Sequence, residues 1–295
     1  MDTNTNLKRR QVNSSTSKRI KLSDPCEKCS QPIISSKPHI CTCQTGLVNI
    51  GNSCYINTVF QAISELNLFS STDPSSQMHS LFSQLCTYSP SPLCPDLALF
   101  ECQPFWTHEN LQEDAFEFLI TILPLIDSYK VMFEVLSQKY CEICHFSYEP
   151  NIQEEFCFNM NLADKDLQTQ INGSLEAIDE VCENCGKGFL TKMRNVTKEP
   201  EVFMVRVMRF QVNQKTGKAS KIWSKVLLPE NICVGSRKYS LAVVISHKSK
   251  ALNHGHYMVY LHKKKIIIDD EKVFYNKPLK LDCSYFYLAF YVIDN

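Results

Sequence analysis

The sequence lacks an apolar run long enough to cross a bilayer. Its longest, Phe118–Ile126, is interrupted by Thr121 and Pro124 and falls well short of the roughly 18 residues that a membrane span needs. It also lacks an excess of either charge, because Lys+Arg and Asp+Glu both number 31. A balanced charge gives no global reason to bind nucleic acid or an anionic membrane. We therefore expect neither as a partner.

An export signal is also missing, since Met1–Ser17 is largely polar. The chain nevertheless carries 15 cysteines. An odd number of cysteines in a chain without such a signal argues against a disulfide framework. Reduced thiols in the cytosol or nucleus fit better, with some of them holding metal and one a candidate nucleophile.

Residues 1–45 are predicted to form a disordered basic tail that contains cysteines. Residues 1–25 are rich in Ser, Thr, Asn, Lys and Arg and have too few large apolar side chains to order themselves. Within them, Lys18-Arg19-Ile20-Lys21 is similar to a short nuclear-import signal, and a solvated basic tail is an equal alternative. The sequence therefore predicts a location in the nucleus, the cytoplasm or both.

Two amphipathic helices are predicted in the segment that follows the tail. After Cys54, apolar residues recur at helical spacing, and residues 52–53 are of types that cap helices. A second helix is predicted over 111–123, where Asn110 and Glu113 form a plausible capping box.

The second half of the chain is predicted to consist mainly of antiparallel strands. In residues 203–208, Phe203, Val205 and Val207 alternate with Met204, Arg206 and Met208. Later segments are rich in β-branched and aromatic residues, namely 239–247, 256–262, 266–268 and 285–293. Helices first and strands later indicate an α+β fold.

The most informative stretch is GLVNIGNSCYINTVFQ, residues 46–61, which places Cys54 where a glycine-containing turn runs into a helix. The unpaired N–H groups and positive dipole end of a helix N-terminus favour a thiolate over a thiol. Such a position lowers the pKa of a cysteine, especially beside a histidine. Taken alone, a cysteine at a helix start is more often a small buried residue.

This stretch closely resembles the cysteine box of the ubiquitin-specific proteases, Gly-Leu-x-Asn-x-Gly-Asn-Thr-Cys-Tyr-x-Asn, with Ser53 in place of the usual Thr. The resemblance implies that Cys54 attacks the carbonyl carbon of ubiquitin's C-terminal glycine. It also implies that Asn49 donates a side-chain hydrogen bond to the oxyanion, together with a backbone N–H near Cys54. The alternative for Asn49 is that it only braces its own loop.

A histidine loop between two predicted strands resembles the histidine box of the same family. Gly255-His256-Tyr257 matches its Gly-His-Tyr, which implies that His256 is the catalytic base and that Tyr257 lies at the substrate. A cysteine nucleophile needs such a base, and the base needs a third group to orient it. By the resemblance, we predict Asp269 for this role, with Asp270 as the alternative.

Two Cys-x-x-Cys knuckles, Cys141 with Cys144 and Cys182 with Cys185, predict a structural zinc site. Zinc prefers four thiolates in a tetrahedron, and each knuckle supplies two from a tight turn. The gap between the knuckles exceeds the short spacing of zinc ribbons, so we expect a β-hairpin to join them. In the family that the chain resembles, this zinc lies in a fingers region that cradles the body of ubiquitin.

A second cluster of metal-binding residue types precedes the globular segment. It could bind another zinc ion, or its thiols could simply be exposed to solvent in a tail; its members are Cys26, Cys29, His39, Cys41 and Cys43.

The segment Gln112–Phe118, QEDAFEF, resembles the family's Gln-x-Asp-Ala-x-Glu-Phe helix. By this resemblance, Gln112 and Asp114 face the channel for ubiquitin's tail, whose arginines suit acidic neighbours. Glu117 is expected to support the fold. Without the resemblance, an exposed acidic helix face is the simpler interpretation.

Together these motifs imply a papain-like cysteine peptidase over residues 46–295, with a thumb (about 46–128), zinc-bearing fingers (about 129–205) and an antiparallel-sheet palm (about 206–295). The expected partners are ubiquitin, ubiquitinated proteins and an activating protein, and no catalytic cofactor is expected. The alternatives are a ubiquitin-binding pseudoenzyme and a protease for a ubiquitin-like modifier. A zinc-finger nucleic-acid binder is disfavoured by the neutral net charge.

Overall fold

The computed structural model describes residues 44–87, 89–109, 111–162, 166–173, 176–187, 189–212, 219–249, 255–279 and 283–294. The predicted tail, except for residues 44 and 45, lies outside these residues. So do the import-like basic cluster and the N-terminal cysteines. Across the described residues, no helix is both long and apolar enough to span a bilayer.

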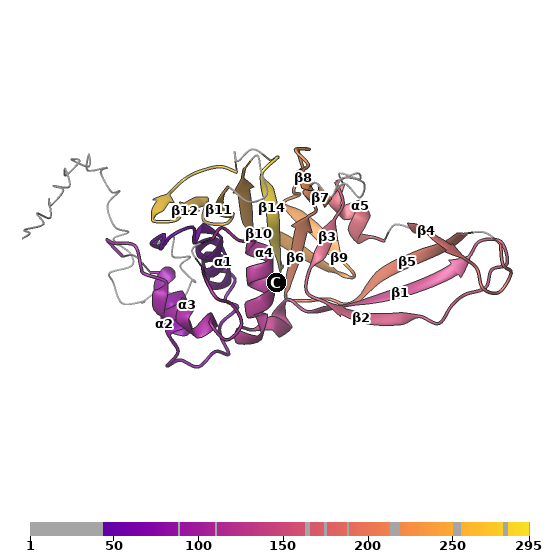
Figure 1. Cartoon of the computed structure of the whole chain (residues 1–295), viewed down its shortest axis with the longest axis horizontal. Coiled ribbons are helices and arrows are strands. Elements are labelled where there is room, and N and C mark those ends of the chain that lie inside the picture. The colour runs from indigo at the N-terminus through magenta and orange to yellow at the C-terminus, as the bar shows by residue number, and fades with distance from the viewer. Residues whose placement is uncertain are drawn as a thin grey trace, which may run out of the picture. The chain divides into compact units, whose positions relative to one another are not determined.

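The helices gather in the first part of the described chain. They are α1 (Cys54–Glu65), α2 (Gln77–Leu85), α3 (Asp96–Cys102) and α4 (Ala115–Ile122), followed by the 3-10 helices η2 (Leu123–Leu125) and η3 (Ser128–Lys130). The first helix begins at Cys54 as predicted. It packs against α4 on one side and against the strands β10 (Arg237–Lys248) and β11 (His256–Leu261) on the other, an arrangement visible in Figure 1.

An eight-stranded sheet contains the strands that were predicted in the second half. In spatial order it runs β13 (Lys272–Phe274), β12 (Ile266–Asp269), β11, β10, β14 (Phe286–Ile293), β6 (Val202–Val207) and β3 (Phe158–Met160), and β9 (Asn231–Val234) also pairs with β10. β3 pairs with β6 in parallel, whereas the other pairings are antiparallel. These strands confirm the predicted segments and the α+β class.

A four-stranded antiparallel sheet extends away from the larger one (Figure 1). Its order is β2 (Asn151–Glu155), β1 (Phe133–Cys141), β5 (Phe189–Lys198) and β4 (Glu176–Val181). Between the two knuckles, the chain leaves this sheet after β2, contributes β3 to the large sheet, forms α5 (Leu167–Ile171) and returns as β4. The predicted hairpin between the knuckles is therefore wrong, because β3 pairs with β6 instead of with a neighbour along the chain.

Two hydrophobic clusters lie on opposite faces of the large sheet, and β6 contributes to both. Val202 and Met204 join the cluster that includes α1 and α4, whereas Phe203, Val205 and Val207 join the other cluster. Successive side chains of a strand point to opposite faces, so the apolar run of β6 reflects burial on both sides. A separate two-stranded sheet pairs β7 (Phe210–Val212) with β8 (Ala219–Lys221).

The start of α4 differs from the prediction. The helix begins at Ala115, because the Asp114 carboxylate accepts hydrogen bonds from the backbone N–H groups of Phe116 and Glu117. The predicted capping box of Asn110 and Glu113 is therefore wrong, and Asn110 lies outside the described residues. An aspartate directly at the N-cap satisfies two of the four N–H groups that have no intrahelical partner.

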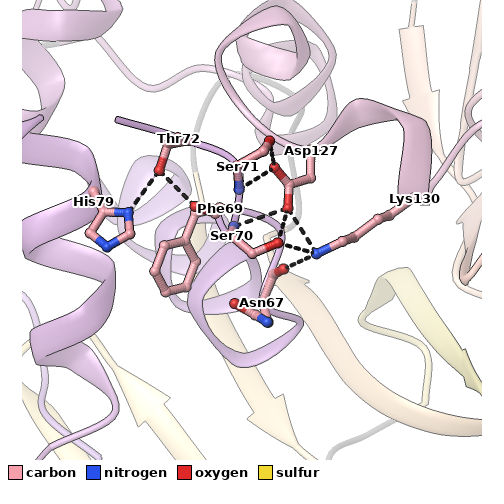
Figure 2. A network of polar contacts seen from close by, with 8 residues as sticks. All are labelled: Asn67, Phe69, Ser70, Ser71, Thr72, His79, Asp127 and Lys130. Carbon is pink, nitrogen blue, oxygen red and sulfur yellow. Dashed lines mark hydrogen bonds and ion pairs between the residues drawn. The ribbon is translucent and has the colours of Figure 1, made fainter. Parts of the chain in front are cut away.

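A buried carboxylate, Asp127, fixes the loop that follows α1 (Figure 2). It accepts hydrogen bonds from the backbone N–H and the hydroxyl of both Ser70 and Ser71, and it pairs with Lys130 at 2.8 Å. Its side chain is 0% exposed. Burial by itself raises the pKa of Asp127, but the hydrogen bonds from Lys130, Ser70 and Ser71 outweigh it and lower the pKa. The carboxylate therefore stabilises the fold in its charged form.

Replacing Asp127 with asparagine is expected to reduce the free energy of unfolding by about 2–4 kcal/mol at pH 7, since a donor replaces an acceptor and Lys130 loses its counter-charge. The pKa is depressed in the folded state, so this contribution is present above about pH 4 and is lost as the pH falls further. Urea unfolding at several pH values measures it.

The matched control is Glu180→Gln, which breaks the exposed pair with Lys139 and should change stability by less than about 1 kcal/mol. Equal losses in the two variants at pH 7 would contradict the role assigned to Asp127.

Candidate active site

Cys54 is the first residue of α1, and its side chain is 3% exposed. The turn before it has left-handed backbone at Gly51 (φ 105°) and Asn52 (φ 49°). Ser53 occupies the N-cap but makes no side-chain capping bond; its hydroxyl instead accepts from the Ile50 N–H at 3.0 Å. Helix N–H groups near Cys54 are therefore free of a side-chain cap, which suits a thiolate at that end.

His256 and Asp269 face one another on neighbouring strands. His256 opens β11 and Asp269 closes β12, and these strands pair antiparallel. The His256 Nε2 lies 2.5 Å from Oδ1 of Asp269. Because a carboxylate only accepts, Nε2 must be the donor. The structure thus places Asp269, and not Asp270, against the imidazole.

Packing of α1 against β11 brings together two elements that begin at Cys54 and His256, although the two residues are far apart in the sequence. The hydrogen bond with Cys54 raises the pKa of His256 to about 9, and the bond with Asp269 adds to this effect against the opposing effect of burial. An imidazolium is therefore favoured at neutral pH. The pair can hold a thiolate and keep a proton ready for a leaving group.

Gly255 precedes His256 because a side chain would not fit there. A Cβ at this position would clash with Nε2 of His247 and would lie 2.6 Å from Cβ of Ser249. His247 is buried and stacks on Tyr257, with ring centroids 4.4 Å apart. Burial lowers the pKa of His247 to about 4, with further contributions from the charges of Lys221 and His256, so its ring is neutral at pH 7.

Asn49 and Asp270 are joined by a hydrogen bond. The Asn49 Nδ2 donates to Asp270 at 2.8 Å, and its Oδ1 accepts from the backbone N–H groups of Gly51 and Ser53 at 3.0 and 3.3 Å. Asp270 also accepts from Asn57 of α1 at 2.8 Å. The Asn49 carboxamide is therefore held at both ends, and one hydrogen of its amide nitrogen remains beyond the one given to Asp270.

Gln112 bridges from the segment before α4 to the residue before His256. Its Oε1 accepts from the Gly255 N–H at 2.8 Å, and its Nε2 donates to the Gly255 carbonyl. The same nitrogen lies 3.8 Å from the Cys54 sulfur. The Gln112 amide thus contacts both the backbone beside His256 and the nucleophile Cys54. A sequence pattern does not reveal this bridge, because its two ends lie on separate segments.

Asp114 and Tyr257, both predicted at the substrate, lie in different surroundings. The Asp114 carboxylate, besides capping α4, accepts the Tyr287 hydroxyl at 2.8 and 2.6 Å. Tyr257 is 2% exposed and belongs to the hydrophobic cluster that includes α1. Its burial raises its pKa well above the ordinary value, so the phenol stays neutral.

Two further side chains lie at the site, and no role for them was predicted from the sequence. Lys221 is 9% exposed and donates to the carbonyls of His247 and Ser249 at 2.6 and 3.4 Å. It thereby holds the end of β10, whose Lys248 is registered opposite His256. Burial lowers the pKa of Lys221 to about 8. The other side chain, His108, contacts the turn before Cys54; a lone histidine in a loop gives no sequence signal for such a contact.

The four knuckle cysteines converge at the far end of the four-stranded sheet. The sulfur–sulfur distances are 3.9 Å between Cys141 and Cys185 and 3.6 Å between Cys144 and Cys182, and all four ligand atoms lie within 4.8 Å of one another. Four thiolates about 2.3 Å from one zinc ion stand about 3.8 Å apart in a tetrahedron. The residues therefore fit a structural zinc ion.

The two knuckles also have the same backbone turn geometry. The N–H of His145 donates to the Cys141 carbonyl at 2.9 Å, and that of Gly186 donates to the Cys182 carbonyl at 2.8 Å. His145 and Gly186 both have left-handed backbone, with φ of 56° and 63°. This repeated geometry supports the assignment of both turns to one metal site. The N-terminal cysteine cluster lies outside the described residues.

Comparisons with known proteins identify a family and a fold. A family model described as "UCH: Ubiquitin carboxyl-terminal hydrolase" matches residues 45–291. A chain in the structure of the SAGA Ubp8/Sgf11/Sus1/Sgf73 DUB module bound to ubiquitin aldehyde is similar, with a TM-score of 0.69 at 16% identity over 90% of this chain and 73% of that one. At this identity the likeness shows the fold alone, and it confirms the predicted α+β architecture.

Curated relatives are distant and much longer. Ubiquitin carboxyl-terminal hydrolase 26 of Oryza sativa subsp. japonica is 24% identical over 258 residues, covering 73% of this chain and 24% of the relative. Ubiquitin carboxyl-terminal hydrolase 24 of Homo sapiens is 27% identical over 222 residues, covering 62% of this chain and 8% of the relative. The chain thus spans less than a quarter of the length of these relatives.

Proposed function

The chain belongs to the ubiquitin carboxyl-terminal hydrolase family, and from this premise we propose that it is a thiol-dependent deubiquitinase. The proposed reaction is hydrolysis of the isopeptide or peptide bond after the C-terminal glycine of ubiquitin. The observation that carries the proposal is the alignment of Cys54, His256 and Asp269, in which the bond with Cys54 raises the pKa of His256 to about 9. Such a pair supplies both a nucleophile and a proton donor.

The chemistry follows from the two protonation states of His256. The Cys54 thiolate attacks the carbonyl carbon, and the electron pair of the C=O bond moves onto the oxygen. The imidazolium then gives its proton to the departing amine, which leaves a thioester on Cys54. Neutral His256 next takes a proton from water, and the hydroxide attacks the thioester. The intermediate collapses, the C–S bond breaks to release the Cys54 thiolate beside protonated His256, and the carboxylic acid product loses its proton to bulk water.

Asn49 is the proposed side-chain donor to the oxyanion. Its amide nitrogen gives one hydrogen to Asp270 and retains another for the substrate oxygen. The two backbone donors on Oδ1 hold the carboxamide in one orientation, so little reorganisation is needed during the reaction. Loss of such a donor typically costs about 10²–10³-fold in turnover. Asp269 and Asp270 thus have different proposed partners, the base and the oxyanion donor.

The remaining proposed contacts concern ubiquitin itself. We propose that Gln112 and Asp114 lie along the channel for the ubiquitin tail, and that Tyr257 positions this channel from beneath, since its side chain is buried. The thumb, fingers and palm are proposed to span about 46–128, 129–205 and 206–295, although β3 and β6 of the second range belong to the large sheet. The four knuckle cysteines are proposed to hold structural zinc.

An activating protein and a nuclear or cytoplasmic location complete the proposal. The solved structure cited above is of a module that contains four named proteins, and this supports a search for a partner of the present chain. The predicted import-like cluster, at residues 18–21, supports testing the nucleus first.

Ubiquitin bearing a C-terminal electrophile tests the proposed function directly. It should form a covalent adduct with the folded, zinc-loaded chain, and Cys54→Ala should abolish the adduct. The matched control is Cys94→Ser, since Cys94 is an exposed cysteine elsewhere. Adducts only with a ubiquitin-like modifier would redirect the proposal to that substrate. Binding of ubiquitin without adduct or turnover would indicate a pseudoenzyme.

Turnover is expected to fall as the pH rises through about 9, the pKa of His256, because only the imidazolium protonates the leaving amine. The pKa is raised, so the proton is held through neutral pH and lost above it. Asp269→Asn removes the negative charge that helps to raise this pKa, and the upper limb of the kcat/KM profile should move to lower pH. Asp294→Asn, on an exposed carboxylate, is the control. An unmoved upper limb in the Asp269 variant would refute its orienting role.

A further inference from the structure

His108 contacts both sides of the nucleophile from a separate segment of the chain. It lies between α3 and α4, whereas the nucleophile turn lies before α1. Its Nε2 is 2.8 Å from the Gly51 carbonyl, and its Nδ1 is 3.1 Å from the Tyr55 hydroxyl. Gly51 precedes Cys54 and Tyr55 directly follows it. One imidazole therefore bridges the two flanks of Cys54.

The partners of His108 determine its tautomer. A carbonyl oxygen only accepts, so Nε2 must carry a hydrogen and donate to Gly51. In the neutral ring Nδ1 then accepts the Tyr55 hydroxyl, whose oxygen in turn accepts the Trp106 Nε1–H at 3.2 Å. Burial raises the pKa of Tyr55 to about 12, so this hydroxyl remains a donor at neutral pH. In this series of hydrogen bonds, from Trp106 through Tyr55 and His108 to Gly51, each donor thus has one acceptor.

The Gly51 carbonyl lies at a backbone position that needs such a tether. Gly51 and Asn52 both have positive φ, 105° and 49°, and glycine adopts many conformations at similar energy. Holding the carbonyl toward His108 selects one orientation of the peptide between these two residues. A rigid turn here matters, because the Gly51 N–H is also one of the donors that hold Oδ1 of Asn49.

We propose that His108 is a positioning residue that acts through Gly51 to keep the Asn49 carboxamide aimed at the oxyanion. This inference rests on the proposed function and adds a residue to it. Among the described residues, the hydrogen bonds of His108 go to Gly51 and Tyr55 and not to Cys54 or His256, so we expect it to act on the transition state more than on ubiquitin binding. Its loss should therefore lower kcat and leave KM nearly unchanged.

Two variants distinguish the effect of the His108 hydrogen bonds from the effect of an aromatic ring at this position. His108→Phe keeps an aromatic ring but removes both hydrogen bonds, and we expect kcat to fall about 10²-fold, the usual cost of a small misplacement at an active site. His108→Gln can place an amide nitrogen where Nε2 lies, and we expect it to restore kcat to within about fivefold of wild type. Thermal unfolding of both variants checks that each is folded. A glutamine variant as slow as the phenylalanine variant would overturn the proposal.

A double-mutant cycle with Asn49→Ala tests the route of action. If His108 acts through Asn49, His108→Phe should cost much less in the Asn49→Ala background than in the wild type. Full additivity of the two losses would overturn the proposal.

A readout that needs no turnover keeps the test separate from that of the proposed function. Long-range ¹H–¹⁵N NMR spectra of the wild-type chain at pH 7.5 should show His108 as the Nε2–H tautomer, whereas the Nδ1–H tautomer would overturn the proposal. An absence of ubiquitin hydrolysis with the expected tautomer would refute the proposed function and leave the tether standing as a structural feature of the turn.

Discussion

Replacing His256 with alanine is expected to lower kcat about 10⁴-fold or more, because the thiolate loses its counter-ion and the leaving amine loses its proton donor. This size of effect is supported by the hydrogen bond of His256 with Asp269 and by the interaction with Cys54, which raises the pKa of His256 to about 9. The measurement is hydrolysis of a fluorogenic ubiquitin C-terminal amide. KM should change little, since His256 is not proposed to contact the body of ubiquitin.

A histidine beyond the same strand gives the matched control for this variant. His262 follows β11, which begins at His256, and it has no proposed part in the reaction. His262→Ala should therefore retain turnover within about threefold unless it loses stability, which thermal unfolding reports. An His256 variant that keeps a tenth of the wild-type kcat would contradict the proposed mechanism, whatever the control shows.

Loss of the knuckle thiolates is expected to unfold the end of the four-stranded sheet. The buried apolar cluster at that end contains only Cys141, Cys182 and Leu190 among its fully buried described residues, so packing alone stabilises it little. Zinc binding to four thiolates can contribute on the order of 10 kcal/mol to folding such a region. Cys144→Ser should therefore release the ion and expose the knuckle turns, residues 142–147 and 183–187, to proteases.

The kinetic consequence should differ from that of His256→Ala. If the four-stranded sheet holds the body of ubiquitin, Cys144→Ser should raise KM by about tenfold or more with a smaller effect on kcat. Cys233→Ser, at an exposed cysteine outside the cluster, should change neither. Limited proteolysis and zinc content per chain complete the measurement. A Cys144 variant that retains its zinc and its KM would contradict both the site and its role.

Zinc content also addresses the N-terminal cluster that the sequence singled out. One zinc ion per chain, lost in the Cys144 variant, would account for the knuckles alone. A second ion that survives in the same variant would favour the predicted site among Cys26, Cys29, His39, Cys41 and Cys43.

Features that depend on neighbours along the chain were predicted well. The start of α1 at Cys54 followed from apolar residues at helical spacing, an effect within a few turns, although Ser53 at the N-cap makes no side-chain capping bond. The strands at 239–247 and 285–293 followed from their β-branched and aromatic content. The knuckles followed from paired cysteines two residues apart. In each case the physical cause acts over a few residues, so the pattern is visible in the sequence.

Features that depend on which segments meet were predicted poorly. The helix α4 is capped by Asp114 and not by the predicted capping box of Asn110 and Glu113. The Asp114 carboxylate also accepts a hydrogen bond from the Tyr287 hydroxyl of a distant strand. The expected hairpin between the knuckles is replaced by β3, which pairs with β6. At position 255 only glycine fits, because any side chain would collide with His247. His247 belongs to β10, whereas Gly255 directly precedes β11. Local propensity gives no information on such partners, because tertiary packing overrides it.

The sequence by itself determined the family, the α+β class, the identity of the candidate nucleophile and base, and the four thiolates suited to zinc. Only the tertiary structure decided that Asp269 and not Asp270 meets the imidazole, that Asp270 instead holds Asn49, and that Gln112 and His108 hold the backbone beside the base and the nucleophile. The reason is physical: residue types decide which chemistry is available, whereas a hydrogen bond forms only between atoms that packing brings within about 3 Å.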